Sequence, residues 1–320
     1  MSVTVLAGGV GAARLLRGVV RAVPPSEVTA VVNTGDDTVL HGLAISPDID
    51  TIVYTLAEAI DPDRGWGLAG ETWRTMEALG RYTSVRPDGS TAGSTWFNLG
   101  DQDLATHLYR AARLAEGADP TTVTGEIARA WGLTLRLLPM TDDRFRTIIT
   151  LAENGEEVSF QDYFVRLRHG VEISSVRFTE DATATGTVMA ALNDADVVVI
   201  APSNPIVSIG PIRSLPGVDD ALAARRESVV AVSPIVGGAA LKGPADRMLR
   251  ELDMEASVVG IARHYAPIAD VLVIDVVDAD LAAAVEAAGM RCVVAPSIMS
   301  SPERAEALAR VCLGCVRPSG

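Results

Sequence analysis

Two groups of residues near the N-terminus combine side chains and spacing suited to phosphate and metal chemistry. The first, Gly8, Gly9 and Gly11, follows an apolar run at 3–7 and precedes a helical pattern. Such a turn lets the backbone approach a ligand and offers unpaired N–H groups to an anion. We expect this turn to bind phosphate together with Arg14, one turn into the helix. Tight strand–helix packing and a solvated helix face are the alternative explanations.

The second group is acidic. The turn NTGDD at 33–37 places Asp36 and Asp37 after another apolar run, and Asp48 and Asp50 follow in SPDID. Adjacent carboxylates repel one another, a cost that a divalent cation removes. Hard oxygen ligands suit Mg²⁺, which usually takes further oxygens from substrate phosphates. At least one of these acids is therefore predicted to bind Mg²⁺, with helix capping and turn formation as the alternative.

Two polar loops follow apolar strands in the second half of the chain, APSNPIVSIGPI at 201–212 and SPIVGG at 233–238. Ser203, Asn204 and Ser208 supply hydrogen-bonding groups, while prolines fix the turns. Parallel strands end at the same edge of a sheet, so the two loops together predict a nucleotide-binding cradle. Either loop alone would be an ordinary connection between a strand and a helix.

Two further segments, IDPDRGWG at 60–67 and WFNLGDQDLATH at 96–107, gather acids, arginine and tryptophan in predicted loops. Flat aromatic ligands bind to such surfaces, so we expect substrate contact there, with core or lid positions as the alternative for the tryptophans. For His107 we expect a structural, hydrogen-bonded role. The polar stretch 84–95 reads as a loop.

Apolar runs alternate with helical patterns along most of the chain. This alternation predicts an α/β fold with a doubly wound, Rossmann-like, mostly parallel sheet and helices on both faces. The stretch at about 134–178 has hairpin-like polar breaks and predicts a small inserted antiparallel or helical region within a single domain spanning 1–320. The predicted strands are 3–7, 28–33, 134–138, 146–152, 196–201, 228–233, 257–261, 271–275 and 291–295. The predicted helices are 11–22, 50–59, 70–80, 101–116, 121–131, 184–193, 218–225, 240–252, 279–288 and 302–312.

The composition of the chain argues against several classes of function. A net charge of −14 argues against nucleic-acid binding, because no basic surface would repay displaced counterions. Lys242 is the only lysine among 320 residues. No window approaches the roughly 18 apolar residues that span a membrane, and no leader pattern opens the chain, so we expect a cytoplasmic protein with no membrane partner. Cys312 and Cys315 have no second CxxC pair and are expected to pack rather than bind metal.

Taken together, GGVGAARLLRG, NTGDD, SPDIDTIVYTLA, IDPDRGWG, LGDQDLATH, LLPMTDD and APSNPIVSIGPI resemble the 2-phospho-L-lactate transferase family of coenzyme F-420 biosynthesis, in order and spacing, over nearly the whole chain. The resemblance implies transfer of a phospho-acid from a guanosine diphosphate-linked donor to the deazaflavin Fo, with release of GMP. The archaeal type uses a lactyl donor and gives coenzyme F-420-0. The lysine-poor composition and the GGVG turn look more actinobacterial, which favours the phosphoenolpyruvyl donor and dehydro coenzyme F-420-0.

The same resemblance implies roles for individual residues. Asp36, Asp37 and Asp50 are the implied Mg²⁺ ligands, and Asp37 or Asp50 accepts the proton of the attacking ribityl hydroxyl of Fo. Asp50 and Asn98 match deazaflavin-binding positions, although some members carry a basic residue where this chain has Asn98. The implied substrate-binding residues also include Gly8, Gly9, Gly11, Arg14, Asn33, Ser203, Asn204, Ser208 and Ser233.

Two other classes of protein remain as alternatives. Relatives in the same superfamily bind nucleotide sugars and regulate metabolism, but the segments at 60–67 and 96–107 count against that function. An NAD(P)-dependent oxidoreductase is disfavoured because the glycine turn is not GxGxxG. For folds of this kind we also expect a homodimer.

Overall fold

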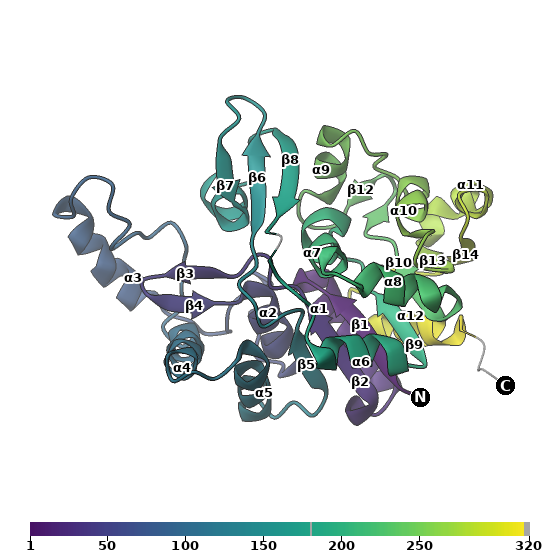
Figure 1. The fold of residues 1–320 in the computed structure, drawn as a ribbon, viewed down its shortest axis with the longest axis horizontal. Helices are drawn as coiled ribbons and strands as arrows, with labels where there is room; N and C mark the ends of the chain where they lie inside the picture. Colours follow the sequence, from purple (N-terminus) through teal and green to yellow (C-terminus); the bar gives the residue numbers. More distant parts are fainter. Residues whose placement is uncertain (180, 317–320) are drawn as a thin grey trace.

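The computed structural model describes residues 1–179 and 181–316. Its centre is a parallel seven-stranded sheet in the order β14–β13–β10–β9–β1–β2–β5 (Figure 1). The residues of β1, β9 and β10 are buried without alternation, as expected of strands covered on both faces. The strands are β1 (Val3–Ala7), β2 (Val28–Val32), β5 (Arg136–Pro139), β9 (Val197–Ile200), β10 (Val229–Val232), β13 (Val271–Ile274) and β14 (Arg291–Val294).

The strand order changes direction beside β1, which pairs with β2 on one side and with β9 on the other. The chain first builds outward from β1 to β2 and β5, and later from β9 to β10, β13 and β14. Open α/β sheets bind ligands in the crevice outside the carboxyl ends of the strands at such a switch point. The glycine turn after β1 and the polar loop after β9 meet there.

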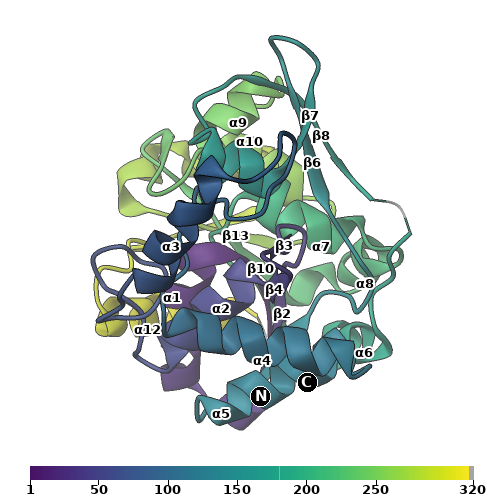
Figure 2. The ribbon, with the colours of Figure 1, turned by 90° about the vertical axis from the view of Figure 1, so that its left-hand side faces the viewer.

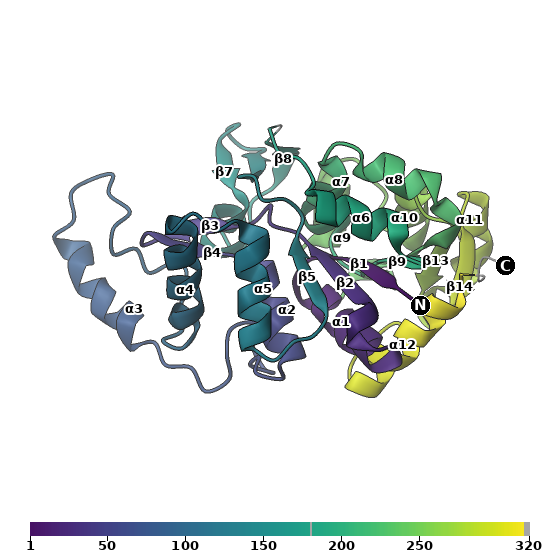
Figure 3. The same cartoon turned by 60° about the horizontal axis from the view of Figure 1, so that its bottom comes forward.

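Helices cover both faces of the sheet, which confirms the predicted fold class (Figure 3). Each face has its own apolar core, because buried side chains of the strands alternate between the two layers. One face is covered by α1 (Gly9–Ala22), α2 (Pro47–Leu56), α5 (Pro120–Ala130) and α12 (Pro302–Gly314). The other is covered by α6 (Gly186–Asp194), α7 (Gly210–Ser214), α8 (Val218–Ala224), α10 (Val258–Tyr265) and α11 (Ala282–Ala287).

The strand predicted at 257–261 is wrong, because this segment begins α10. The Ser257 hydroxyl accepts hydrogen bonds from the backbone N–H groups of Val259 and Gly260 and so caps the helix. A short, fully apolar run does not distinguish a buried strand from a buried helix. The buried residues Val258, Ile261, Ala262 and Tyr265 recur at helical spacing. Two of these four residues lie beyond residue 261, where the predicted strand ends, so the predicted range is too short to show the helical pattern.

Smaller elements lie above the carboxyl edge of the main sheet (Figure 1). An antiparallel sheet β7–β6–β8 occupies part of the stretch singled out at 134–178, whereas β5 joins the main sheet. The smaller elements are the hairpin β3 (Thr38–Leu40) and β4 (Leu43–Ile45), then β6 (Thr147–Leu151), β7 (Glu157–Ser159), β8 (Ile173–Phe178), β11 (Ile235–Val236), β12 (Ala239–Ala240) and α9 (Ala245–Glu251). The division of the chain into domains stays a prediction. Short helical turns are η1 (Pro25–Glu27), η3 (Asp162–Arg166), η4 (Pro205–Ile209), η5 (Arg226–Ser228) and η6 (Val276–Leu281).

An arm formed by α3 (Arg74–Leu79), η2 (Gly80–Ser84) and the following loop extends from the body, and α4 (Asp103–Ala115) packs on β4 at its base (Figures 1 and 2). Two carboxylates fix this base. Glu71 accepts hydrogen bonds from the backbone N–H groups at the start of α4, and Asp101 accepts them at the start of α3. Within the described residues, no helix has the length and apolarity to cross a membrane.

Candidate functional site

Asn33, directly after β2, organises a group of carboxylates. Its amide nitrogen donates to Asp48 Oδ2 at 2.9 Å and to Asp36 Oδ1 at 3.4 Å, and its carbonyl oxygen accepts from the Gly35 N–H at 2.8 Å. One side chain thus ties the turn after β2 to the first turn of α2. Gln161, from the antiparallel sheet region, donates to the backbone oxygen of Asp36 at 3.1 Å. Two of the four predicted acids, Asp36 and Asp48, therefore lie together on Asn33.

The acids in this group are poorly solvated. Burial raises the pKa of Asp36 well above its usual range, and the nearby charges of Asp48 and Asp37 raise it further. Burial also raises the pKa of Asp37 to about 8, although a 2.7 Å hydrogen bond from the Ser46 hydroxyl opposes this shift. Among the described residues, the enclosed Asp37 Oδ1 and the Thr34 hydroxyl have no hydrogen-bond partner. Such a set of hard, desolvated oxygens is suited to a cation.

The glycine turn lies against this group because it lacks side chains. A Cβ on Gly8 would come within 2.9 Å of Asp48 Oδ2 and 2.7 Å of Ser208 Cβ. A Cβ on Gly11 would lie 2.5 Å from the carbonyl oxygen of Pro202, in the loop after β9. Ser203 closes the same contact by donating to the Gly8 carbonyl at 2.8 Å. Close approach of two loops at the switch point is thus what requires glycine here.

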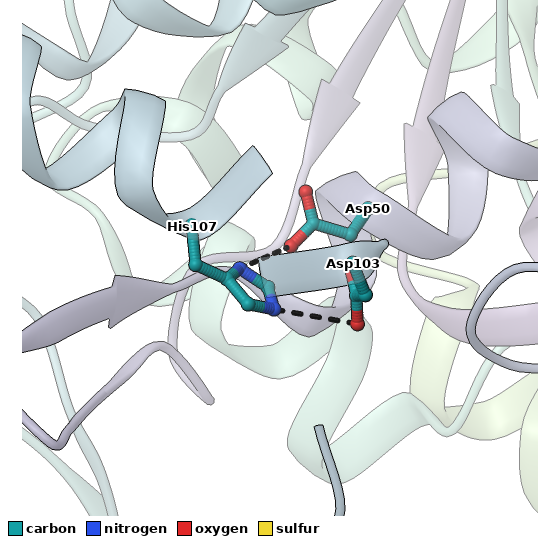
Figure 4. Close-up of side chains that lie close together, drawn as sticks. All are labelled: Asp50, Asp103 and His107. Carbon is teal, nitrogen blue, oxygen red and sulfur yellow. Dashed lines mark ion pairs between the residues drawn. The ribbon is translucent and has the colours of Figure 1, made fainter. Parts of the chain in front are cut away.

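The Asp50 carboxylate points towards His107 of α4 (Figure 4). Both of its carboxylate oxygens accept hydrogen bonds from the buried Arg110, one of them at 3.1 Å. His107 lies between two acids, with Nδ1 3.7 Å from Asp50 Oδ2 and Nε2 3.3 Å from Asp103 Oδ2. The Tyr54 hydroxyl donates to the other Asp103 oxygen at 2.5 Å. The imidazole of His107 thus lies between α2 and α4, but among the described residues its buried Nε2 has no hydrogen-bond partner, so the expected hydrogen-bonded role is met only in part.

Asp50, Asp103 and His107 also offer ligand atoms that all lie within 4.8 Å of one another. A cation there would have to compete with the guanidinium of Arg110, which already neutralises Asp50. Among the described residues, no cation donates a hydrogen bond to the acids around Asn33, and Arg110 acts on Asp37 only through its charge, so we regard this group as the better candidate for a metal.

Two cavities flank the carboxylate group. The larger, of about 440 Å³, lies beyond β2 and β5 and is lined by Asp36, Asp37, Arg110 and Phe160, among others. The smaller, of about 110 Å³, lies at the switch point and is lined by Gly11, Arg14, Asn204, Ser233, Lys242 and Ser297, among others. Asp36 and Asp37 form part of the larger cavity, while Asp48 reaches the glycine turn beside the smaller one. These acids would therefore lie between two ligands bound one in each cavity.

The predicted residues fall into three groups. Those in or beside the smaller cavity are Gly8, Gly9, Gly11, Arg14, Ser203, Asn204, Ser208 and Ser233. Asn33, Asp36 and Asp37 belong to the carboxylate group, and Asp50 is paired with Arg110. Asn98 is exposed, next to the buried Leu99, and lines neither cavity.

Sequence reasoning did not identify Arg110, Gln161 or Lys242 as site residues. Arg110 had a detectable signal, since Asp103, His107 and Arg110 occur at i, i+4 and i+7 and so share one face of a helix. Lys242 was noted only as the single lysine. For Gln161 we find no sequence signal, because it contacts Asp36 across 125 positions of the chain.

Comparison with known proteins gives a consistent result. The family described as 2-phospho-L-lactate transferase CofD matches residues 3–298. A protein from Streptomyces griseus named phosphoenolpyruvate transferase is 41% identical over 318 residues, covering 98% of each chain. One of the same name from Mycobacterium avium is 41% identical over 329 residues, covering 94% of this chain and 95% of its own. A UPF0052 family protein from Bacillus halodurans shares the fold, with a TM-score of 0.60 at 18% identity over 98% of each chain.

Proposed function

Because this chain belongs to the 2-phospho-L-lactate transferase CofD family, we propose that it transfers a phosphoenolpyruvyl group from a guanosine diphosphate-linked donor to the deazaflavin Fo. The products would be dehydro coenzyme F-420-0 and GMP. The phosphoenolpyruvyl donor is preferred to the 2-phospho-L-lactyl donor because the relatives from Streptomyces and Mycobacterium are named phosphoenolpyruvate transferase. Membership of a transferase family also disfavours the nucleotide-sugar-binding regulator.

One observation carries this proposal, namely that buried carboxylates lie between two cavities of different character. The smaller cavity, with Arg14 and Lys242, suits the phosphates of the donor. The larger one combines apolar walls with polar groups and has a volume in the range of typical ligand sites, about 300–1,000 Å³, so it suits the flat acceptor. With these placements the ribityl hydroxyl of Fo approaches the donor phosphorus beside Asp36, Asp37 and Asp48.

The residues present fit a magnesium ion. Desolvation and mutual repulsion raise the pKa of Asp36, and the enclosed Asp37 Oδ1 lacks a protein partner among the described residues. Asp36 and Asp37 would hold the ion, as the family resemblance implies, and Asp48 is better placed than Asp50 to assist them because Arg110 occupies both Asp50 oxygens. Bound there, Mg²⁺ would supply charge neutralisation for the diphosphate.

Asp37 is the better placed of the two acids considered as the proton acceptor. It lines the larger cavity, one of its oxygens accepts from Ser46, and the other is unpartnered among the described residues. Asp50 has a different part in this proposal, since its pairing with Arg110 fixes a cation in the wall of the acceptor cavity.

The test is mass spectrometry of the products formed from purified protein, Fo, Mg²⁺ and each candidate donor. The enolpyruvyl product is lighter than the lactyl product by two hydrogen atoms, so one measurement identifies the donor. Product from the lactyl donor alone would overturn the choice of donor. Absence of any product, together with no change in Fo fluorescence on titration with protein, would favour the nucleotide-sugar-binding regulator instead.

A further inference from the structure

The smaller cavity contains the only lysine of the chain, Lys242, opposite Arg14 of α1. Within residues 1–179 and 181–316, neither cation forms an ion pair with a carboxylate. Arg14 is half-buried, whereas Lys242 is exposed to solvent. The cavity therefore carries two uncompensated positive charges.

The hydroxyl groups lining this cavity are already engaged. Ser233 Oγ donates to the backbone oxygen of Ile235 at 2.9 Å, and Ser297 Oγ donates to Asp275 Oδ2 at 3.0 Å. Positive charge is thus the main attraction that the cavity offers to a ligand. Its volume of about 110 Å³ is well below the roughly 300 Å³ of small ligand pockets, so it accommodates phosphate groups rather than a whole nucleotide.

The tip of a loop from the other half of the chain lies beside Lys242. The loop is closed by pairing of Ile60 with Leu68, and the Asp61 carboxylate accepts the backbone N–H of Arg64 at 2.8 Å. At its tip Gly65 is buried with φ +74°, and a Cβ there would lie 3.1 Å from Lys242 Nζ. A side chain at this position would therefore contact the Lys242 ammonium group.

We propose that Lys242 and Arg14 bind the phosphate groups of a nucleoside diphosphate ester, and that Gly65 is a positioning residue for Lys242. The inference rests on the proposed function only in identifying that ester as the donor. A lysine ammonium group binds phosphate as a compact point charge, while an arginine guanidinium donates two parallel hydrogen bonds, so the pair satisfies adjacent phosphates.

The first test uses the fact that Lys242 is the only side-chain amine. The wild-type protein is treated with an amine-reactive ester, and modification at Lys242 is followed by mass spectrometry of its peptide, with the N-terminal amine as internal reference. Saturating GDP or inorganic pyrophosphate should slow modification of Lys242 at least tenfold while leaving the N-terminal amine unaffected. An unchanged rate with both anions, at concentrations where each is shown to bind, would overturn the proposal.

The second test compares glycine variants within one loop. Gly65→Ala and Gly67→Ala introduce a side chain at similar left-handed backbone angles, φ +74° and +66°. The added Cβ would lie near Lys242 only at Gly65, and at Gly67 it would meet no other residue within 4 Å. We expect Lys242→Gln to raise the KM for the donor about tenfold or more, the usual consequence of losing one charged contact, with the KM for Fo unchanged. Gly65→Ala should act in the same direction, and Gly67→Ala should not.

Equal donor KM values for Gly65→Ala and Gly67→Ala would remove the positioning role of Gly65. A wild-type donor KM in Lys242→Gln would remove Lys242 from the site while leaving the proposed transferase function intact. Conversely, protection of Lys242 by pyrophosphate in a protein that transfers no group to Fo would support the phosphate site and contradict the proposed function.

Discussion

Replacing Asp37 by asparagine should stabilise the metal-free protein at alkaline pH while removing its activity. The folded chain holds this carboxyl where water reaches it poorly, and Oδ1 has no partner among the described residues. Ionisation of the Asp37 carboxyl therefore costs free energy in the folded state but not in the unfolded chain. Asparagine keeps the shape and the acceptor for the Ser46 hydroxyl but carries no charge.

The sign and size of this effect follow from the pKa of Asp37, about 8 when folded against an ordinary value of 3.8. Between these values the folded protein keeps a proton that the unfolded chain has lost, so the free energy of unfolding falls as pH rises from about 4 to about 8. Below this window the penalty is absent, and above it the penalty is complete. A difference of about four pKa units corresponds to at most about 6 kcal/mol.

The measurable gain should be smaller than this limit, because Asp37 keeps some solvent contact and its acidic neighbours remain. We expect about 2–3 kcal/mol of added stability at pH 9 and almost none at pH 4. Urea unfolding with a metal chelator, followed by tryptophan fluorescence, measures the difference. Asp88→Asn, in an exposed loop, serves as the control and should change little at either pH. Equal effects of Asp37→Asn at both pH values, or a loss of stability at pH 9, would refute this reasoning.

Three further predictions concern neighbouring contacts. Asp48→Asn should weaken Mg²⁺ binding, measured by calorimetry, at least as much as Asp50→Asn. A larger effect of Asp50→Asn would favour Asp50 as the metal ligand, as the family resemblance implies. Arg110→Met should lower the free energy of unfolding by about 3–5 kcal/mol, because it leaves the buried Asp50 without its guanidinium partner, and the double variant with Asp50→Asn should recover part of that loss. Gly11→Ala should cost ~2 kcal/mol in chemical denaturation, since its Cβ meets a backbone oxygen at 2.5 Å, whereas Gly186→Ala, which meets no atom within 4 Å, should be neutral or slightly stabilising.

The sequence predicted those parts of the fold that depend on local pattern. Fully apolar runs such as 3–7 identify strands of a parallel sheet, because such strands are buried on both faces. The same rule failed at 257–261, where a short apolar run belongs to a helix buried on most sides. The hairpin β3–β4 was not predicted, since its three-residue strands are too short to show an alternating pattern.

The candidate site was predictable in composition but not in its pairings. The turn at 33–37 and the acids of α2 were identified as one cluster, and the structure brings Asp36 and Asp48 together on Asn33. The pairing of Asp50 with Arg110 joins residues 60 positions apart, so it depends on how α4 docks against α2. No local pattern contains that information.

The two acids of α2 illustrate why the distinction matters for function. Residues two positions apart on a helix point about 200° apart, because each residue turns the helix by about 100°. Asp48 therefore faces the glycine turn, where a Cβ on Gly8 would touch it, and Asp50 faces Arg110 of α4. One short helix thus presents one carboxylate to the crevice beside the smaller cavity and uses the other to secure a cation in the wall of the larger cavity. The effect of a substitution at Asp48 or Asp50 should therefore be interpreted from the helix face on which that aspartate lies. The two aspartates should not be treated as members of a single acidic cluster.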